Sequence, residues 1–214
     1  IDDAAVVVDL SFTTRGDHVA VLEVGGSGLM PALMHRTLLH RTAGGDGAPV
    51  LVEVAGGVLE VAGKPPGKHV GTAGLAPFEP RLLMDWRVDE YLAWSGRLLG
   101  VPKRRAAERA AATLERLHIA GHRRRELRLL TRAERRAIVI AAAVVHEPDV
   151  VICDMPLSRL DTPEQGFVLA TLQRARAGRR SIVSLDRLAL HGAVAEVLRS
   201  ASAVVVLKDG RLLL

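Results

Sequence analysis

Apolar residues recur along the chain in short runs that alternate with longer stretches of helical spacing. The short runs are rich in Val, Ile and Leu and are bounded by turn-forming residues. They predict strands at residues 6–10, 18–24, 69–72, 150–153, 181–185, 203–207 and 211–214. The longer stretches predict helices from near Leu29 and at residues 88–99, 103–118, 131–146, 163–177 and 188–199. Strands that alternate with helices predict an α/β fold with a mostly parallel sheet.

Two segments depart from this alternation. Residues 50–54 and 58–61 flank the turn at Gly56-Gly57, which predicts a small antiparallel β piece. Two consecutive amphipathic helices at residues 88–99 and 103–118 predict an inserted helical subdomain at residues 88–125. The α/β core is then expected to comprise residues 1–87 and 126–214.

The composition adds few constraints. The chain has 214 residues, which is ample for one core, and its 29 basic and 24 acidic residues give a formal net charge of +5. This excess allows weak attraction to acidic surfaces, but we expect no specific nucleic-acid partner. The single cysteine, Cys153, lies in an apolar run and is expected to be a buried strand thiol. The longest clean apolar run, residues 137–145, is far shorter than the roughly 20 residues of a membrane-spanning helix.

Several segments carry possible chemistry. Gly25, Gly26, Ser27 and Gly28 lie between a predicted strand and a predicted helix, but without a following Lys they are weak support for a phosphate loop. Further along, Glu147-Pro148-Asp149 leads into an apolar strand that ends at Asp154. The next seven residues read Met-Pro-Leu-Ser-Arg-Leu-Asp. Another apolar strand ends at Asp186, and the chain closes with Val-Leu-Lys-Asp-Gly-Arg at residues 206–211.

The order and spacing of these segments resemble the ATP-binding cassette (ABC) family across nearly the whole chain. The resemblance implies an α/β fold of the P-loop NTPase type, with a small antiparallel β piece and an inserted helical subdomain. A different P-loop fold would not predict the helical insert or the Ser-Arg-Leu-Asp segment that ends at Asp161.

The resemblance places the phosphate loop at Gly25, Gly26, Ser27 and Gly28. Its last two positions, where the family has Lys and Ser or Thr, are Leu29 and Met30 here. Backbone amides of such a loop can still cradle phosphates. Leu29 and Met30, however, provide neither an ammonium group nor a hydroxyl for magnesium. We therefore expect ATP binding to be weak or absent and magnesium binding to be unlikely.

Other family positions are also changed. The glutamine that senses the γ-phosphate is replaced by Phe78. The signature Leu-Ser-Gly-Gly-Gln falls on a segment in which both glycines are lost, namely Leu130, Thr131, Arg132, Ala133 and Glu134. A partner's γ-phosphate could not approach this backbone as closely as the glycines allow.

The strand-end positions are divided between kept and replaced residues. Asp154 is kept, and two roles stay open for it: residual metal binding, or a hydrogen bond to the adjoining loop. The catalytic Glu is replaced by Met155 and the switch His by Leu185, so no catalytic residue is expected. Ser158 and Asp161 of the loop that follows Asp154 remain.

These features predict a degenerate nucleotide-binding subunit of a membrane transporter complex, a pseudo-ATPase with a structural or regulatory role. The expected partners are an integral membrane transporter subunit, docked near residues 78–86, and a second ABC domain in a homo- or heterodimer. The expected location is cytoplasmic, peripheral on the inner face of the cell membrane. Two alternatives stay open: an active ATPase that uses unusual residues, such as Arg36 or Lys64, and a soluble regulatory ABC protein.

Overall fold

A six-stranded sheet forms the centre of the computed structural model, which describes residues 17–24, 71–208 and 211–213. The strands lie in the order β2-β3-β4-β1-β5-β6. Their bounds are β1 His18–Val24, β2 Ala73–Ala76, β3 Val150–Cys153, β4 Arg180–Leu185, β5 Ala203–Lys208 and β6 Arg211–Leu212. The first five are parallel, and β6 pairs antiparallel with β5 through Leu207 and Leu212. The predicted α/β class with a mostly parallel sheet is confirmed.

The expected short strand at residues 69–72 is wrong in position, because the strand begins at Ala73 (β2). Residues 71 and 72 form a turn, in which Gly71 has a φ of +96°. The sequence Ala-Gly-Leu-Ala of β2 has weak strand propensity, but its place is fixed by packing. A Cβ at Gly74 would lie 1.7 Å from the carbonyl oxygen of Ala143, so only glycine lets the neighbouring helix approach this closely.

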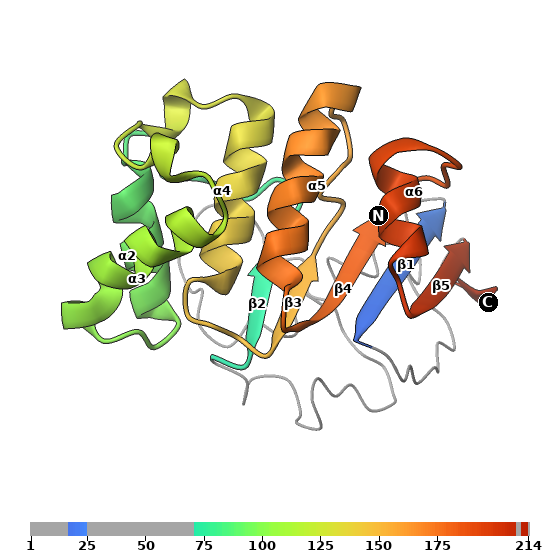
Figure 1. The fold of residues 1–214 in the computed structure, drawn as a ribbon, viewed down its shortest axis with the longest axis horizontal. Coiled ribbons are helices and arrows are strands. Elements are labelled where there is room, and N and C mark those ends of the chain that lie inside the picture. Colours follow the sequence, from blue (N-terminus) through green and yellow to red (C-terminus); the bar gives the residue numbers. More distant parts are fainter. Residues whose placement is uncertain (1–16, 25–70, 209–210, 214) are drawn as a thin grey trace, which may run out of the picture.

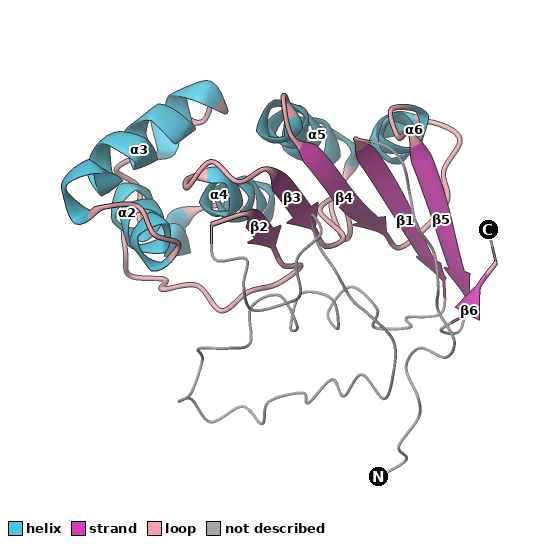
Figure 2. Cartoon of the chain, turned by 90° about the horizontal axis from the view of Figure 1, so that it is seen from below, coloured by secondary structure: helices cyan, strands magenta, loops and turns pink. Residues whose placement is uncertain are grey.

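Five α-helices accompany the sheet in the described part of the chain. They are α2 Val88–Leu98, α3 Lys103–Arg116, α4 Arg132–Val144, α5 Thr162–Arg176 and α6 Gly192–Arg199. Helices α4, α5 and α6 cover one face of the sheet (Figure 2). The last helix was expected from residue 188, but residues 188–191 form a loop and His191 is the N-cap.

Helix α4 is the centre of the apolar core. Its residues from Arg136 to Val144 are all buried, because the helix packs against β2, β3, α5 and the α2–α3 pair. The core that surrounds it is built from Ala, Val, Leu and Ile side chains of the sheet and of all five helices. Cys153 belongs to this core and is fully buried, as expected, and burial raises the pKa of its thiol to about 12.

Helices α2 and α3 pack on each other to the side of α4, beyond the β2 edge of the sheet (Figure 1). The chain enters and leaves this helical segment side by side. The amides of Val88 and Asp89 donate to the carbonyls of Arg125 and Arg123, at 3.0 Å each. The boundaries of a separate subdomain stay a prediction. The predicted strand at 6–10, the helix from Leu29 and the β piece at 50–61 lie outside the described residues.

Candidate functional site

The side chains with candidate chemistry lie where parallel strands end. Strand β3 ends at Cys153 and is followed by Asp154, β4 ends at Leu185 and is followed by Asp186, and β2 leads through Pro77 to Phe78. Because these strands are parallel neighbours, their carboxyl ends share one edge of the sheet, which is where α/β proteins place their ligands.

Asp154 is only 5% exposed, and its carboxylate has an internal partner. The hydroxyl of Ser184 donates to Asp154 Oδ1 at 2.7 Å and accepts the backbone N–H of Met155, also at 2.7 Å. Burial raises the pKa of Asp154, and the Ser184 hydrogen bond opposes this shift. The nearby Glu23 raises the pKa further, whereas the Phe78 amide and Arg136 lower it. The described partner of Asp154 therefore lies on the neighbouring strand β4. The two roles that the sequence left open, residual metal binding and a hydrogen bond to the adjoining loop, stay predictions.

Phe78 lies under two guanidinium groups. The Cζ atoms of Arg136 and Arg159 are 4.5 and 5.2 Å from the centroid of its ring, within the range of cation–π attraction. Arg136 is 5% exposed and donates from Nη1 to the carbonyl of Met155 at 3.3 Å. Burial lowers the pKa of Arg136, and Glu79 and Asp154 counteract that effect. A buried cation therefore lies in the field of the Asp154 carboxylate.

The two positions expected to have lost catalytic groups differ in their surroundings. Leu185 is 1% exposed and belongs to the apolar core. Met155 is half-buried and has a φ of +41°, a left-handed conformation that costs a non-glycine residue about 1–3 kcal/mol. Its N–H donates to Ser184 Oγ, and its carbonyl accepts from Arg136 Nη1 and from the backbone N–H of Ser158. These hydrogen bonds hold the conformation in place.

The loop from Ser158 to Asp161 is tied to its neighbours. Ser158 Oγ donates to Asp186 Oδ2 at 2.6 Å, which connects the ends of β3 and β4. Asp161 is the N-cap of α5, where its side chain accepts from the amide of Glu164 at 2.8 Å. Arg159 also has a positive φ, of +57°, and its carbonyl accepts from Arg132 Nη1 at 3.0 Å.

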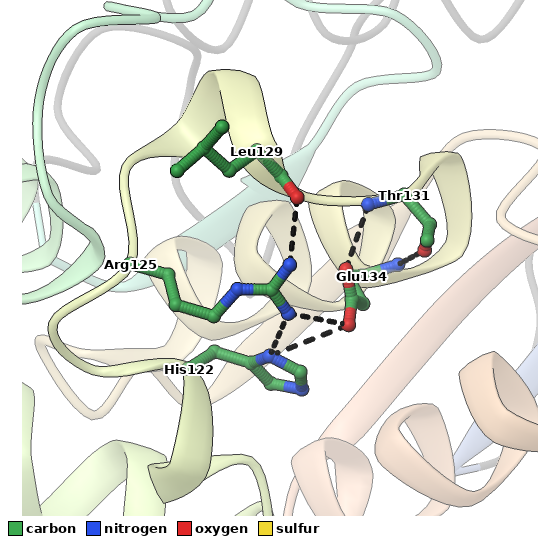
Figure 3. Close-up of polar contacts among 5 residues, drawn as sticks. All are labelled: His122, Arg125, Leu129, Thr131 and Glu134. Atoms are coloured by element: carbon green, nitrogen blue, oxygen red, sulfur yellow. Dashed lines mark hydrogen bonds and ion pairs between the residues drawn. The ribbon is translucent and has the colours of Figure 1, made fainter.

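The segment from Leu130 to Glu134 begins α4 and is held by a polar cluster (Figure 3). Thr131 and Glu134 form a capping box, in which each side chain accepts from the backbone N–H of the other residue. Glu134 Oε1 also accepts from Arg125 Nη1 at 2.8 Å and lies 3.5 Å from His122 Nδ1. Burial raises the pKa of Glu134, but the Thr131 amide, Arg125 and His122 outweigh it, so the pKa is lowered overall. Leu130 and Ala133 are buried, and Arg132 is exposed.

Comparison with known proteins finds distant relatives among the ATP-binding proteins of ABC transporters. The chain is 33% identical over 134 residues to an aliphatic sulfonates import ATP-binding protein of Frankia alni, an alignment that covers 63% of this chain and 51% of that protein. It is 26% identical over 231 residues to an uncharacterized ABC transporter ATP-binding protein of Methanocaldococcus jannaschii, covering 99% and 80% of the two chains. A Nod factor export ATP-binding protein of Cupriavidus pinatubonensis is 28% identical over 186 residues, covering 85% and 54%.

The chain is a distant homologue of the ATP-binding proteins of ABC transporters. No protein-family model matches it. It spans about half of the length of the first of these relatives, so we treat transport activity, substrate and partners below as proposals.

This ABC-type chain brings together most of the positions that the sequence singled out. Phe78, Asp154, Met155, Leu185 and the 158–161 loop all lie along the carboxyl edge of the sheet, and Arg132 connects the signature segment to that loop. The six residues from Gly25 to Met30 lie outside the described residues, so their relation to Asp154 stays a prediction.

Sequence reasoning missed two residues of this edge. Ser184 and Arg136 contact Asp154, Met155 and Phe78, but neither was named as a candidate site residue. The signal for Arg136 was available, since it is a cation on the otherwise apolar face of α4. Ser184 lies in an apolar strand, and its role becomes visible only when β3 and β4 are paired.

Proposed function

We propose that this ABC-type chain is a transporter subunit that does not hydrolyse ATP and has a structural or regulatory role. One observation carries the proposal: the Asp154 carboxylate has an internal donor, Ser184 Oγ, and a guanidinium, that of Arg136, in its field. Magnesium prefers several oxygen ligands, often with water among them. No group of three or more potential metal-ligating side chains occurs among the described residues.

The replaced residues support the same proposal. Met155 has no carboxylate to act as a general base, and Leu185 has no imidazole and is packed in the core. Phe78 places an aromatic ring where the resemblance expects a glutamine, and that ring is covered by two guanidinium groups. In the described part of the site, the charged groups therefore have partners within the chain. We do not expect magnesium to bind there.

A second candidate is a subunit that binds ATP and hydrolyses it with unusual residues. Two observations favour it: the retained Asp154 and the relatives, whose names describe them as ATP-binding proteins. In that case the amides of residues 25–28 would hold the phosphates, and a Lys or Arg from elsewhere would supply the missing charge.

The first test is ATP hydrolysis by the purified chain with magnesium. We expect no turnover above background, because loss of one transition-state stabiliser costs about a hundred- to a thousand-fold and several are absent. The matched control is a variant with Asp154→Asn, which should have the same background rate. Turnover in the range of ordinary ABC ATPases that Asp154→Asn abolishes would overturn the proposal and favour the second candidate.

The second test is nucleotide affinity with and without magnesium. We expect weak or absent ATP binding that magnesium does not change. The double variant Leu29→Lys with Met30→Ser restores the ammonium and hydroxyl groups, so it should raise affinity if residues 25–28 form an amide cradle. Tight, magnesium-dependent binding by the unmodified chain would contradict the proposal.

We also propose that the chain docks onto an integral membrane subunit through residues 83–86 and their neighbours. Leu83, Met84 and Trp86 are exposed, and Trp86 packs edge-on against the exposed Trp94 of α2, with ring centroids 5.8 Å apart. Arg128 N donates to the carbonyl of Met84, which brings the exposed Leu129 to the same region. Large apolar groups gathered in this way are common anchors of protein interfaces.

The structure changes which residues are suited to test this docking. Phe78 is half-buried against Arg136 and Leu82 packs on the core, so neither is a free anchor. We expect Trp86→Asp to abolish co-purification with the membrane subunit while the chain still folds. The control is Leu190→Asp, which changes an exposed leucine before α6 and should leave association intact. Association that survives Trp86→Asp would place the partner elsewhere.

The same proposal includes the helical subdomain, the second ABC domain and the location of the chain at the membrane. The segment 88–125 would be a helical subdomain, supported by the paired backbone at its two ends. A second ABC domain would pair with the edge that carries Arg132, Arg159 and the 158–161 loop. None of the described helices combines the length and apolarity needed to span a bilayer. We propose that the chain is peripheral on the inner face of the membrane, held there by its membrane partner.

A further inference from the structure

The tryptophans and the tyrosine of the chain are gathered in one place. The sequence has two tryptophans and one tyrosine, and all three lie on α2 or just before it. The ring centroid of Trp94 is 5.8 Å from that of Trp86 and 6.1 Å from that of Tyr91. Both tryptophans are exposed, whereas Tyr91 packs against the core. Trp and Tyr are the side chains that proteins place where an apolar phase meets water.

One turn beyond Trp94, helix α2 ends with an exposed leucine. Leu98 follows Trp94 by four residues, so the two side chains lie on the same side of the helix. Leu98 is 61% exposed, although Val88 and Leu92 of the same helix are fully buried. The exposed apolar surface that begins at the tryptophans therefore continues to the end of α2, at one end of the molecule (Figure 1).

The turn that follows Leu98 adds positive charge to this end. The turn is tight, because the amide of Val101 donates to the carbonyl of Gly96 at 2.9 Å and α3 begins two residues later. Four exposed cations flank it, namely Arg97, Lys103, Arg104 and Arg105. None of them is in an ion pair with another described residue. The first carboxylate along α3 is that of Glu108, so an excess of about three positive charges remains.

The cations at the start of α3 do not stabilise that helix. A helix N-terminus has a partial positive charge and is stabilised by acidic residues, yet the first turn of α3 has none. The other end of α2 is different. There the guanidinium of Arg87 donates to Asp89 at 3.1 and 3.2 Å, and Arg123 lies 3.6 Å from the same carboxylate. The exposed surface is therefore balanced in charge near Trp86 and strongly cationic near Leu98.

We propose that the tip of the α2–α3 pair, formed by Trp94, Leu98 and the four cations, binds directly to the surface of an anionic lipid bilayer. The headgroups of such a bilayer supply negative charge to the cations, and the boundary of the acyl chains accepts the apolar side chains. The apolar half of the tip favours a bilayer over a nucleic acid, whose phosphates attract cations but offer no apolar phase.

This inference rests on the proposed position of the chain at the membrane and adds a contact with the lipid itself. It uses the cationic end of the exposed surface, whereas the proposed docking onto a membrane subunit uses the balanced end near Trp86. The two contacts are therefore separable by substitution.

The first test measures binding of the full chain to vesicles by sedimentation. We expect binding to an equal mixture of phosphatidylcholine and phosphatidylserine, weakened by salt, and no binding to phosphatidylcholine alone. Replacing Lys103, Arg104 and Arg105 together by Gln should lower the affinity at least tenfold, because each basic residue near an anionic surface contributes up to about fivefold. The control replaces three exposed cations of the sheet region by Gln, namely Arg180, Arg187 and Lys208. It changes the net charge equally and should bind as the unmodified chain does.

The second test follows the apolar half of the tip. In a chain with Trp86→Phe, Trp94 is the single tryptophan, and its fluorescence should shift to shorter wavelength on the mixed vesicles. Brominated lipid should quench it, because the indole enters the boundary between headgroups and acyl chains. Leu98→Ala should lower the affinity about fivefold, because less apolar surface enters the bilayer. Leu190→Ala changes an exposed leucine before α6 and should have no effect.

Three outcomes would overturn the proposal. The mixed vesicles do not bind the chain, the two triple variants weaken binding equally, or Trp94 fluorescence stays unchanged while residues 103–105 mediate binding to duplex DNA. The last outcome would assign the cations to nucleic acid. Because the vesicles contain no membrane subunit, these results are independent of the co-purification and ATP hydrolysis tests of the proposed function.

Discussion

The two edges of the sheet treat buried charge in opposite ways. At the carboxyl edge, Asp154 has Ser184 as a donor, Arg136 has the Met155 carbonyl, and Ser158 donates to Asp186. At the amino edge, where the strands begin, two nitrogens of Arg116 at the end of α3 are enclosed without any acceptor. Both edges are made by the same parallel strands, so the difference arises from the loops and helices that pack at each edge.

This contrast distinguishes the two edges by how their enclosed polar groups are satisfied. Buried polar groups in proteins are almost always hydrogen-bonded, and exceptions are rare. The carboxyl edge, where the family resemblance predicts nucleotide chemistry, is satisfied from within the chain as far as the structure describes it. The amino edge, where no motif was recognised, has the unpaired donors.

The largest effect is expected from Ser184→Ala at the carboxyl edge. The change leaves the Asp154 carboxylate and the Met155 N–H without their shared partner, which should lower the free energy of unfolding by about 2–4 kcal/mol. Denaturant unfolding measures this. Ser158→Ala is the control, because its partner Asp186 is exposed, and it should cost less than about 1 kcal/mol. Equal effects of the two changes would contradict an internally satisfied Asp154.

A smaller loss is expected from Phe78→Gln, which restores the residue that the family has at this position. Glutamine offers no aromatic face to Arg136 and Arg159, so the free energy of unfolding should fall by about 1–2 kcal/mol. Arg159→Gln removes only the exposed guanidinium and should cost under about 0.5 kcal/mol by the same measurement. A stabilising effect of Phe78→Gln would show that the ring is not part of the internal packing of this edge.

Glu134→Gln should have a pH-dependent effect. The pKa of Glu134 is lower in the folded state than its usual 4.5. Its charge therefore stabilises the fold fully above that pH, and the stabilisation is lost as pH falls through the lowered value. We expect the substitution to cost about 1 kcal/mol at pH 7 and less as pH falls below 4.5, measured by denaturant unfolding across the acidic range. A cost that does not change across the acidic range would assign the effect to shape and not to charge.

The smallest effect tests the amino edge. Arg116→Met removes an enclosed cation that has no acceptor, so the free energy of unfolding should stay within about 0.5 kcal/mol or rise. The matched change at the other edge, Arg136→Met, should cost about 2 kcal/mol, because it removes a bonded cation beside Asp154. If both substitutions were equally destabilising, the contrast between the edges would be refuted.

The sequence by itself determined the order of strands and helices from Val88 onward. The near-continuous apolar run of β3 and the helical spacing of α4 each belong to an element buried on several sides, so their patterns were unambiguous. The apolar strands that end at an acidic residue also revealed Asp154 and Asp186. Local signals failed at β2, because Ala-Gly-Leu-Ala becomes a strand only through the close approach of Ala143 to Gly74.

The tertiary structure alone decided which charges have partners. Ser184 and Asp154 are 30 residues apart, and Arg136 and Met155 are 19 apart, so strand pairing and helix packing had to bring them together before either contact could be recognised. The same holds at the amino edge, where Arg116, Glu147 and Arg179 come from three separate elements. A hydrogen bond requires an acceptor within about 3 Å, and such proximity between distant residues is a property of the folded chain and not of local sequence.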